Sequence, residues 1–241
     1  MKKLLLTLIL AGAVLAQTKS DTTKAAPKAA TPAKAAPKAA APDLLNPSSM
    51  KARAPEVFRA KLTTTKGDVV LEINRAWAPI GADRFYNLVR AGFFTNVAFF
   101  RVVPRFMVQF GISPRPDVAR AWENAQIIDD PVKQSNKRGR ITFAKTGAPN
   151  SRTTQVFINY VDNVFLDPQG FAPVGEVVEG MENVDKIYSG YGESPDQGRL
   201  HSEGKAYSDK AFPMLDKVVS ASIVPLPTAA PADGKATDTK K

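Results

Sequence analysis

The sequence has 241 residues, a formal net charge of +10, no cysteine and one histidine. The lack of cysteine excludes disulfides, iron–sulfur clusters and a cysteine nucleophile, and the single histidine excludes most histidine-based metal sites. Nine Lys or Arg and two Asp fall in residues 1–53, and three Lys and two Asp in 225–241, which leaves a net charge of +2 for residues 54–224. Because the positive charge lies at the ends, we expect no folded face that binds nucleic acid.

The first sixteen residues predict a cleaved secretory signal. Lys2 and Lys3 precede an apolar run over residues 4–15, and small or apolar side chains precede a cleavage point after Ala16. At about 1.5 Å per residue this run spans roughly 18 Å, well short of the ~30 Å hydrocarbon core, which disfavours the alternative of a membrane anchor. We expect an exported protein, periplasmic, bound to the cell envelope or extracellular, without an integral membrane segment once mature.

Residues 17–53 are rich in Ala, Pro and Lys and predict a disordered linker. Proline recurs every five residues from Pro27 to Pro47, and almost no large apolar side chain is present. We expect an extended spacer whose lysines make at most weak contact with anionic envelope polymers. Residues 225–241 have a similar composition and predict a disordered tail.

The part between them, residues 54–224, is long enough for one domain. The patterning predicts strands at residues 57–64, 69–73, 97–103, 106–110, 140–144, 155–159, 172–178 and 217–224. Two helices are expected, one from Pro79 to the glycine at position 92 and one over residues 182–188. Loops 113–124 and 189–207 are expected to be long. Many short strands with two helices predict a β-barrel or sandwich.

One stretch has unusual chemistry. Residues 99–111 read F-F-R-V-V-P-R-F-M-V-Q-F-G and place Arg101 on an otherwise apolar strand, followed by Phe106, Met107 and Gln109. A guanidinium is seldom fully buried without a partner. The pattern indicates a groove with an apolar floor and a cationic rim.

This stretch resembles the cyclophilin family of peptidyl-prolyl isomerases. F-A-K-T-G at 143–147, Q-V-F-I at 155–158, F-L-D at 165–167 and G-F-A-P-V-G-E-V-V-E-G-M at 170–181 continue the resemblance in the family's order and spacing. The resemblance implies a mainly β fold, a closed eight-stranded antiparallel barrel capped by two α-helices. It also implies cis/trans isomerisation of X-Pro bonds in proline-containing polypeptides.

The same resemblance assigns site residues. Arg101 falls on the family's catalytic arginine and Gln109 on the polar residue beside it. The proline pocket is implied for Phe106, Met107, Phe157 and Leu166, and the strand edge that pairs with the peptide for Ala144 and Lys145. Phe100, Phe165 and Phe171 replace a His, a Trp and a His common in the family, and we expect them to contact substrate. The change at Phe165 removes an indole N–H donor and puts tight cyclosporin binding in doubt.

The implied chemistry needs no cofactor and no metal. Rotation about the X-Pro amide leaves the lone pair on nitrogen, and a fixed cation that bonds to this nitrogen stabilises the twisted state more than either planar state. Phe110 replaces a glycine common after Gln109, a change that could narrow the groove or reshape the next loop.

Two other functions remain open at this stage, and we expect a monomer in each case. The first is a module that binds proline-containing segments, or a chaperone-like surface, with little turnover. The second is an envelope-attachment protein in which the Lys/Pro/Ala spacer is the working part. His201 lies in a Gly- and Ser-rich loop and is expected to be solvated.

Overall fold

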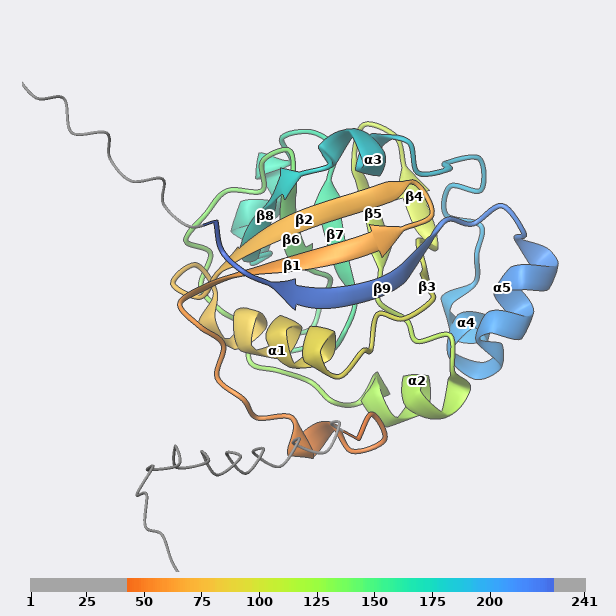
Figure 1. Cartoon of the computed structure of the whole chain (residues 1–241), viewed down its shortest axis with the longest axis horizontal. Helices are drawn as coiled ribbons and strands as arrows, with labels where there is room; N and C mark the ends of the chain where they lie inside the picture. The colour runs from red at the N-terminus through yellow and green to blue at the C-terminus, as the bar shows by residue number, and fades with distance from the viewer. Residues whose placement is uncertain (1–42, 228–241) are drawn as a thin grey trace, which may run out of the picture. The chain divides into compact units, whose positions relative to one another are not determined.

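The computed structural model describes residues 43–227; the predicted signal and most of the predicted linker and tail lie outside the described residues. Nine strands in this part form one antiparallel sheet in the order β3-β9-β1-β2-β8-β6-β7-β5-β4 (Figure 1). Their bounds are Val57–Thr64 (β1), Gly67–Asn74 (β2), Val97–Ala98 (β3), Arg101–Val103 (β4), Met107–Phe110 (β5), Arg140–Phe143 (β6), Val156–Asn159 (β7), Pro173–Glu179 (β8) and Lys217–Val224 (β9). The mainly β fold class is confirmed.

The sheet curls so far that its two end strands belong to one stretch of chain. β3 and β4 are separated only by Phe99 and Phe100, and the two strands have different neighbours. Phe99 still donates its N–H to the carbonyl of Asp216 (2.9 Å), just before β9, whereas β4 pairs with β5. The expected single strand over 97–103 is therefore divided in two, which gives a curled nine-stranded sheet where the sequence predicts eight strands.

The main core lies inside the curl. Burial alternates along the whole of β1, which places Phe58 and Leu62 inward, as a half-buried strand requires. Aromatic rings extend the core from the sheet to the first helix, because Phe94 lies 5.4 Å from Phe85 and 5.7 Å from Phe110 between ring centroids. Such tilted and edge-on pairs add to the stabilisation that their buried area provides.

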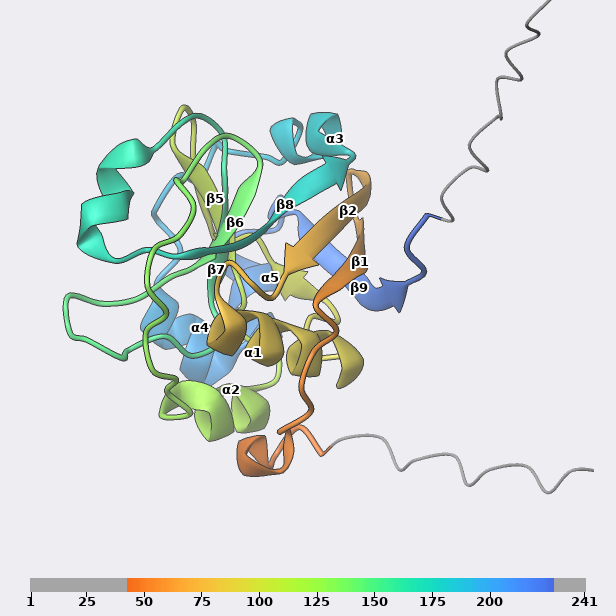
Figure 2. The same ribbon diagram turned by 90° about the vertical axis from the view of Figure 1, so that its left-hand side faces the viewer.

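Two helices lie on opposite sides of the β1–β2 pair, as Figures 1 and 2 show. The first, α1, spans Pro79–Arg90. Pro79 suits its first position, because an N–H there would have no partner within the helix and proline lacks one. The second, α3, spans Met181–Asp185 and is shorter than the helix expected over 182–188. Both expected helices are present at the expected places.

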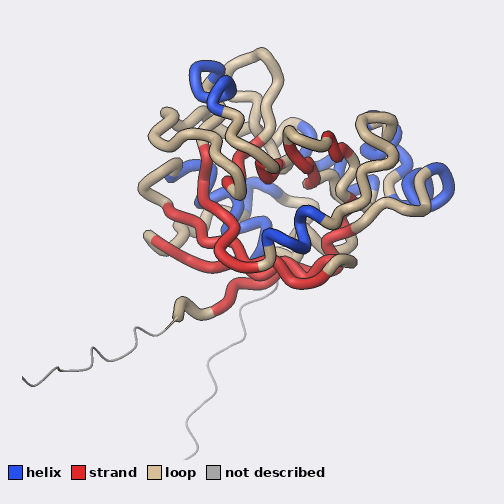
Figure 3. The backbone as a smooth tube through the Cα atoms, turned by 90° about the horizontal axis from the view of Figure 1, so that it is seen from above, coloured by secondary structure: helices blue, strands red, loops and turns tan. Residues whose placement is uncertain are grey.

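Three further helices lie within or begin within the two segments expected to be long loops. They are α2 (Pro116–Glu123), α4 (Gln197–Glu203) and α5 (Lys205–Ala211). The described residues therefore hold five α-helices, together with two 3₁₀ helices, η1 (Pro47–Ser49) and η2 (Val164–Gln169), joined by the loops drawn in tan in Figure 3. None of the helices within residues 43–227 has the length and apolar character needed to cross a bilayer.

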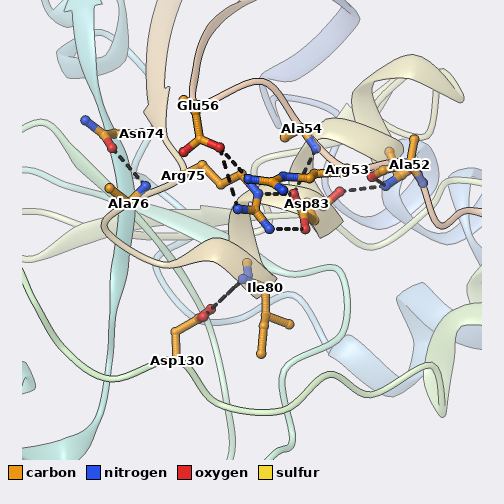
Figure 4. Close-up of polar contacts among 12 residues, drawn as sticks. Ala52, Arg53, Ala54, Glu56, Asn74, Arg75, Ala76, Ile80, Asp83 and Asp130 are labelled. Carbon is orange, nitrogen blue, oxygen red and sulfur yellow. Dashed lines mark hydrogen bonds and ion pairs between the residues drawn. The ribbon is translucent and has the colours of Figure 1, made fainter.

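Residues 43–53, which the sequence assigns to the disordered linker, contact the domain. The carbonyl of Leu44 accepts the indole N–H of Trp122 on α2 (2.8 Å), and Ala52 exchanges two hydrogen bonds with the Asn87 side chain on α1. Just beyond, the Asp83 carboxylate accepts the N–H of Ala54 (2.8 Å), as Figure 4 shows. The predicted boundary after residue 53 is therefore too late, because partners far along the chain order this segment.

The only histidine, His201, belongs to α4 and is half-buried, which corrects the expectation that it is solvated. Its Nδ1 is buried and has no hydrogen-bond partner among the described residues. Burial lowers the pKa of His201, although the nearby Glu123 carboxylate acts in the opposite direction. The folded state therefore disfavours the protonated imidazole.

A pH dependence of stability follows from this burial. Below about pH 6.5 the unfolded chain binds a proton at His201 more readily than the folded chain does, so the free energy of unfolding falls as the pH is lowered. We expect His201→Gln to remove this part of the pH dependence. Urea unfolding of both proteins between pH 7.5 and 5 measures it, and parallel curves for the two proteins would contradict the assignment.

Candidate active site

A groove with a cavity of about 330 Å³ lies beside β4, β5 and β7. Its walls also come from the segment before β7, from η2 and from the start of α4. The lining residues are Arg101, Phe106, Met107, Gln109, Ala144, Lys145, Thr146, Ser151, Thr153, Gln155, Phe157, Leu166, Phe171 and Gln197. Nine of the eleven residues that the sequence predicts for the site are among them.

Alternation along the strands places the groove on the opposite face of the sheet from the main core. On β5, Val108 and Phe110 belong to the main core, whereas Met107 and Gln109 line the groove. On β7, Phe157 faces the groove for the same reason. Since Phe110 points into the core, it does not narrow the groove.

The apolar part of the groove is a separate small cluster. Met107, Phe157 and Leu166 are buried together, and Phe106 and Phe171 pack against them. The rings of Phe157 and Phe171 meet edge to face with centroids 5.9 Å apart. These side chains form a preformed pocket for a compact apolar group, as the sequence predicts for a proline ring.

The helix η2 carries Leu166 into this pocket, and Asp167 fixes its position. The Asp167 carboxylate accepts the backbone N–H of Asn136 (2.9 Å) and the hydroxyl of Ser135 (2.6 Å). Burial alone raises the pKa of Asp167, but the hydrogen bonds from Ser135 and Asn136 outweigh it and lower the pKa. The carboxylate therefore stays charged and anchors the segment that supplies Leu166.

Arg101 forms the cationic side of the groove and is held at three of its nitrogens. Register places it opposite Gln109, whose Oε1 accepts from the Arg101 Nη1 (3.2 Å). The Gln109 amide in turn donates to Gln155 Oε1 (2.7 Å). Nε and Nη2 each lie 2.5 Å from Glu193 Oε1. The guanidinium is 32% exposed and its Cζ lies 5.8 Å from the Phe106 ring centroid, so it adjoins the apolar pocket.

Lys145 lines the groove, but its ammonium is engaged elsewhere. Nζ lies 3.2 Å from Asp129 Oδ2 and 6.0 Å from the Phe171 ring centroid. Burial raises the pKa of Asp129, but the N–H of Asn150 and the Lys145 ammonium outweigh it and lower the pKa. The lysine side chain therefore stabilises the wall of the groove.

The main chain at this wall is the end of a strand. Ala144 donates its N–H to the carbonyl of Gln155 (2.9 Å), one residue beyond β6. The next residue, Lys145, has no backbone hydrogen bond with any other residue in the range 43–227. Its N–H and C=O are thus free to pair with an extended peptide, the role that the resemblance implies for this edge.

Two predicted residues lie outside the lining of the groove. Phe100 packs in a separate buried cluster with Ile112 and Leu200 and does not line the groove, so the structure does not support its prediction as a substrate-binding residue. Its neighbour Arg101 faces the groove, and alternation turns Phe100 to the other side. Phe165 is 54% exposed and stacks on Phe106 at 5.8 Å, which places it at the rim.

Phe100→Leu tests this correction. Loss of ring volume among the α2 and α4 side chains should lower the free energy of unfolding by about 1 kcal/mol. The KM for a proline peptide should stay within twofold of wild type, because the side chain does not reach the groove. Urea unfolding and steady-state kinetics check both, and a raised KM with unchanged stability would restore the predicted role.

Several lining residues were not predicted from the sequence. They are Thr146, Ser151, Thr153, Gln155 and Gln197, together with Glu193, which pairs with Arg101. Gln155 opens the Q-V-F-I block and could have been found from it, since alternation places it on the same face as Phe157. Glu193 and Gln197 carry no local signal. In the described part of the chain, no group of three or more His, Asp or Glu is arranged to hold a metal ion.

Comparison with known proteins agrees with this geometry. Residues 59–204 match the family described as cyclophilin type peptidyl-prolyl cis-trans isomerase/CLD. The chain is 39% identical over 131 residues to peptidyl-prolyl cis-trans isomerase A of Dickeya dadantii, covering 52% of this chain and 68% of that protein. It is 36% identical over 137 residues to peptidyl-prolyl cis-trans isomerase B of Escherichia coli, covering 52% and 80%.

Solved structures show the same fold. The cyclophilin AquaCyp293 from Hirschia baltica superposes with a TM-score of 0.54 at 18% identity, covering 74% of this chain and 78% of that one. A cyclophilin-type isomerase from Cryptosporidium parvum gives 0.53 at 19% identity, covering 71% and 99%. Family match, relatives and fold agree: the chain belongs to the cyclophilin-type peptidyl-prolyl cis-trans isomerases.

Proposed function

We propose that the groove binds an extended X-Pro segment with the proline ring against Met107, Phe157 and Leu166. The pocket is apolar and already formed, which suits a ring that carries no N–H and no charge. The free main chain of Lys145 then pairs with the backbone of the same segment. This arrangement holds the ring while the carbonyl side of the amide rotates.

The chemistry follows from the position of Arg101 beside that pocket. The planar amide resists rotation by about 18–20 kcal/mol because nitrogen shares its lone pair with the carbonyl. In the twisted state the lone pair returns to nitrogen, and an Arg101 N–H donates a hydrogen bond to it. The bond exists only in the twisted state, so it lowers the barrier without tightening the binding of either planar isomer. No covalent bond breaks and no proton is transferred.

Arg101 supports this role because its guanidinium is already oriented. Nε donates a hydrogen bond to Glu193 and Nη1 donates one to Gln109, while Nη2 forms an ion pair with the same Glu193 oxygen; the other N–H groups have no hydrogen-bond partner in the described part of the chain. A donor that is fixed before the substrate arrives needs no reorganisation during the reaction. The proximity of Arg101 to the apolar pocket is the observation that carries the proposal.

A protease-coupled assay on an Ala-Pro peptide tests the function. We expect the wild-type protein to accelerate the cis-to-trans step, which takes tens of seconds without a catalyst. Binding of the peptide without acceleration would instead support the alternative, a module that holds proline-containing segments. No binding and no acceleration would contradict both functions.

We further propose that the clients are exported proteins whose folding waits on X-Pro isomerisation. Lys2, Lys3 and the apolar run at residues 4–15 support export, and the reaction needs no ATP. Fractionation of cells that produce the full chain tests this. Mature protein that begins at Gln17 and leaves with the periplasmic or extracellular fraction supports the proposal; uncleaved protein in the cytoplasm contradicts it.

A further inference from the structure

A carboxylate from a distant part of the chain contacts the arginine of the groove. Glu193 Oε1 lies 2.5 Å from both Nε and Nη2 of Arg101, 92 residues earlier in the sequence. Glu193 is 61% exposed, so the contact is made at the mouth of the groove. It approaches one edge of the guanidinium, while Gln109 accepts from Nη1.

The two residues just before Glu193 anchor the segment that carries it. The carbonyl of Gly192 accepts the N–H of Val102, the residue that follows Arg101 on β4 (3.0 Å). The Tyr191 ring packs edge-on against Tyr188 and Phe212, with centroids 5.2 and 5.0 Å away. Figure 1 shows this part of the chain running from α3 to α4. The position of the carboxylate is therefore set by the fold.

We propose that Glu193 is a positioning residue, which holds the Arg101 guanidinium in the orientation from which it donates to the peptide. A free arginine side chain has many rotamers, and Gln109 alone restricts them with a single hydrogen bond. The carboxylate adds two contacts on the edge of the guanidinium that carries Nε, away from the Nη1 contact with Gln109. The inference rests on the proposed role of Arg101.

The charge of the same carboxylate has an effect on kcat that opposes positioning. A negative charge next to the guanidinium weakens the positive potential that stabilises the twisted amide. If this effect prevailed, removal of the carboxylate would raise kcat. If positioning prevails, removal lowers kcat, because the arginine must then be ordered during each turnover.

Three variants separate the two effects. Glu193→Ala removes the contact, and we expect kcat to fall three- to tenfold with KM within twofold of wild type. Glu193→Gln keeps an oxygen that can accept from Nε but removes the charge beside Nη2, so its kcat should lie between those of Glu193→Ala and wild type. Glu203→Ala is the matched control, because Glu203 pairs with Arg199 on the same segment and does not line the groove. Its kcat should equal that of wild type.

A second readout does not depend on turnover. In ¹⁵N relaxation measurements, the Nε–H group of Arg101 should be more mobile in Glu193→Ala than in wild type and unchanged in Glu203→Ala. If wild type shows no isomerase activity, the proposed function fails, and the relaxation data alone still decide the positioning role. An unchanged or raised kcat in Glu193→Ala, or unchanged mobility of the Arg101 side chain, would overturn the proposal.

Discussion

Arg101→Ala is expected to lower kcat/KM for an Ala-Pro peptide by about 10²–10³, the usual loss when one preorganised donor is removed from an active site. The fold should persist, because the side chain is partly exposed and lies outside the main core. Arg101→Lys should lose nearly as much, since an ammonium lacks the rigid fork that contacts Gln109 and Glu193 together. The coupled assay measures the loss, and thermal unfolding checks the fold.

Arg90→Ala is the control for this experiment. Arg90 ends α1, is exposed and does not line the groove, so its loss should leave kcat/KM unchanged. Equal activity of Arg101→Ala and Arg90→Ala would show that the guanidinium in the groove does not act on the reaction.

Arg152→Ala is expected to cause the largest loss of stability, about 3–5 kcal/mol in the free energy of unfolding. The Arg152 side chain is 2% exposed, and its Nη1 lies 3.0 Å from Asp130 Oδ2, in a carboxylate that is 1% exposed. That carboxylate also accepts the N–H groups of Ile80 and Gly81 at the start of α1 (3.0 and 2.8 Å; Figure 4 draws the first). Without the arginine, Asp130 remains buried and charged with no cation paired to it.

The same site contains a second, partly buried guanidinium, that of Arg84. Burial, and to a lesser extent the charge of Arg152, lower the pKa of Arg84 to about 10. Removal of Arg152 relieves this repulsion, which offsets a small part of the loss. Urea unfolding measures the net change. Arg53→Ala breaks an exposed pair with Glu56 and should change stability by less than about 1 kcal/mol; an equal change in the two variants would contradict the account.

The strands could be predicted from the sequence because their signals are local. Alternating burial in β1 and the two-residue turn at 65–66, closed by Gly67 at the start of β2, are properties of neighbouring residues. The helices α4 and α5 were missed because each has seven residues and a glycine, Gly204, separates them. Helices so short are marginal alone and form through packing, here of Leu200 and Tyr207 against Phe100.

Helix α2 had a local signal that was overlooked. Pro116 at its start, Asp117 in its first turn, and Val118 and Trp122 four residues apart on its buried face are typical of a helix. The prolines at 114 and 116 favoured a loop instead. The segment 43–53 was assigned to the linker from its composition, which gives no hint that Leu44 and Ala52 bond to Trp122 and Asn87.

For the site, the resemblance located the residues that lie on strands. It gave no information on contacts between residues far apart in the sequence. Met107, Gln109 and Phe157 lie where it implies, because strand register fixes them. Phe100 was assigned to the substrate site together with its neighbour Arg101, although alternation along the chain points the two side chains to opposite sides. Glu193 could not be found from the sequence, since only the fold of residues 189–211 brings it to β4.

The central claim is that Arg101 acts on the twisted amide and contributes little to binding of the planar isomers. NMR exchange spectroscopy on an Ala-Pro peptide that saturates the groove tests it most directly, because bound-state shifts report binding and exchange peaks report isomerisation. The account predicts that Arg101→Ala still binds the peptide with similar affinity, while cis–trans exchange in the complex slows by about 10² or more. Exchange as fast in the variant as in wild type, with the peptide bound, would contradict it.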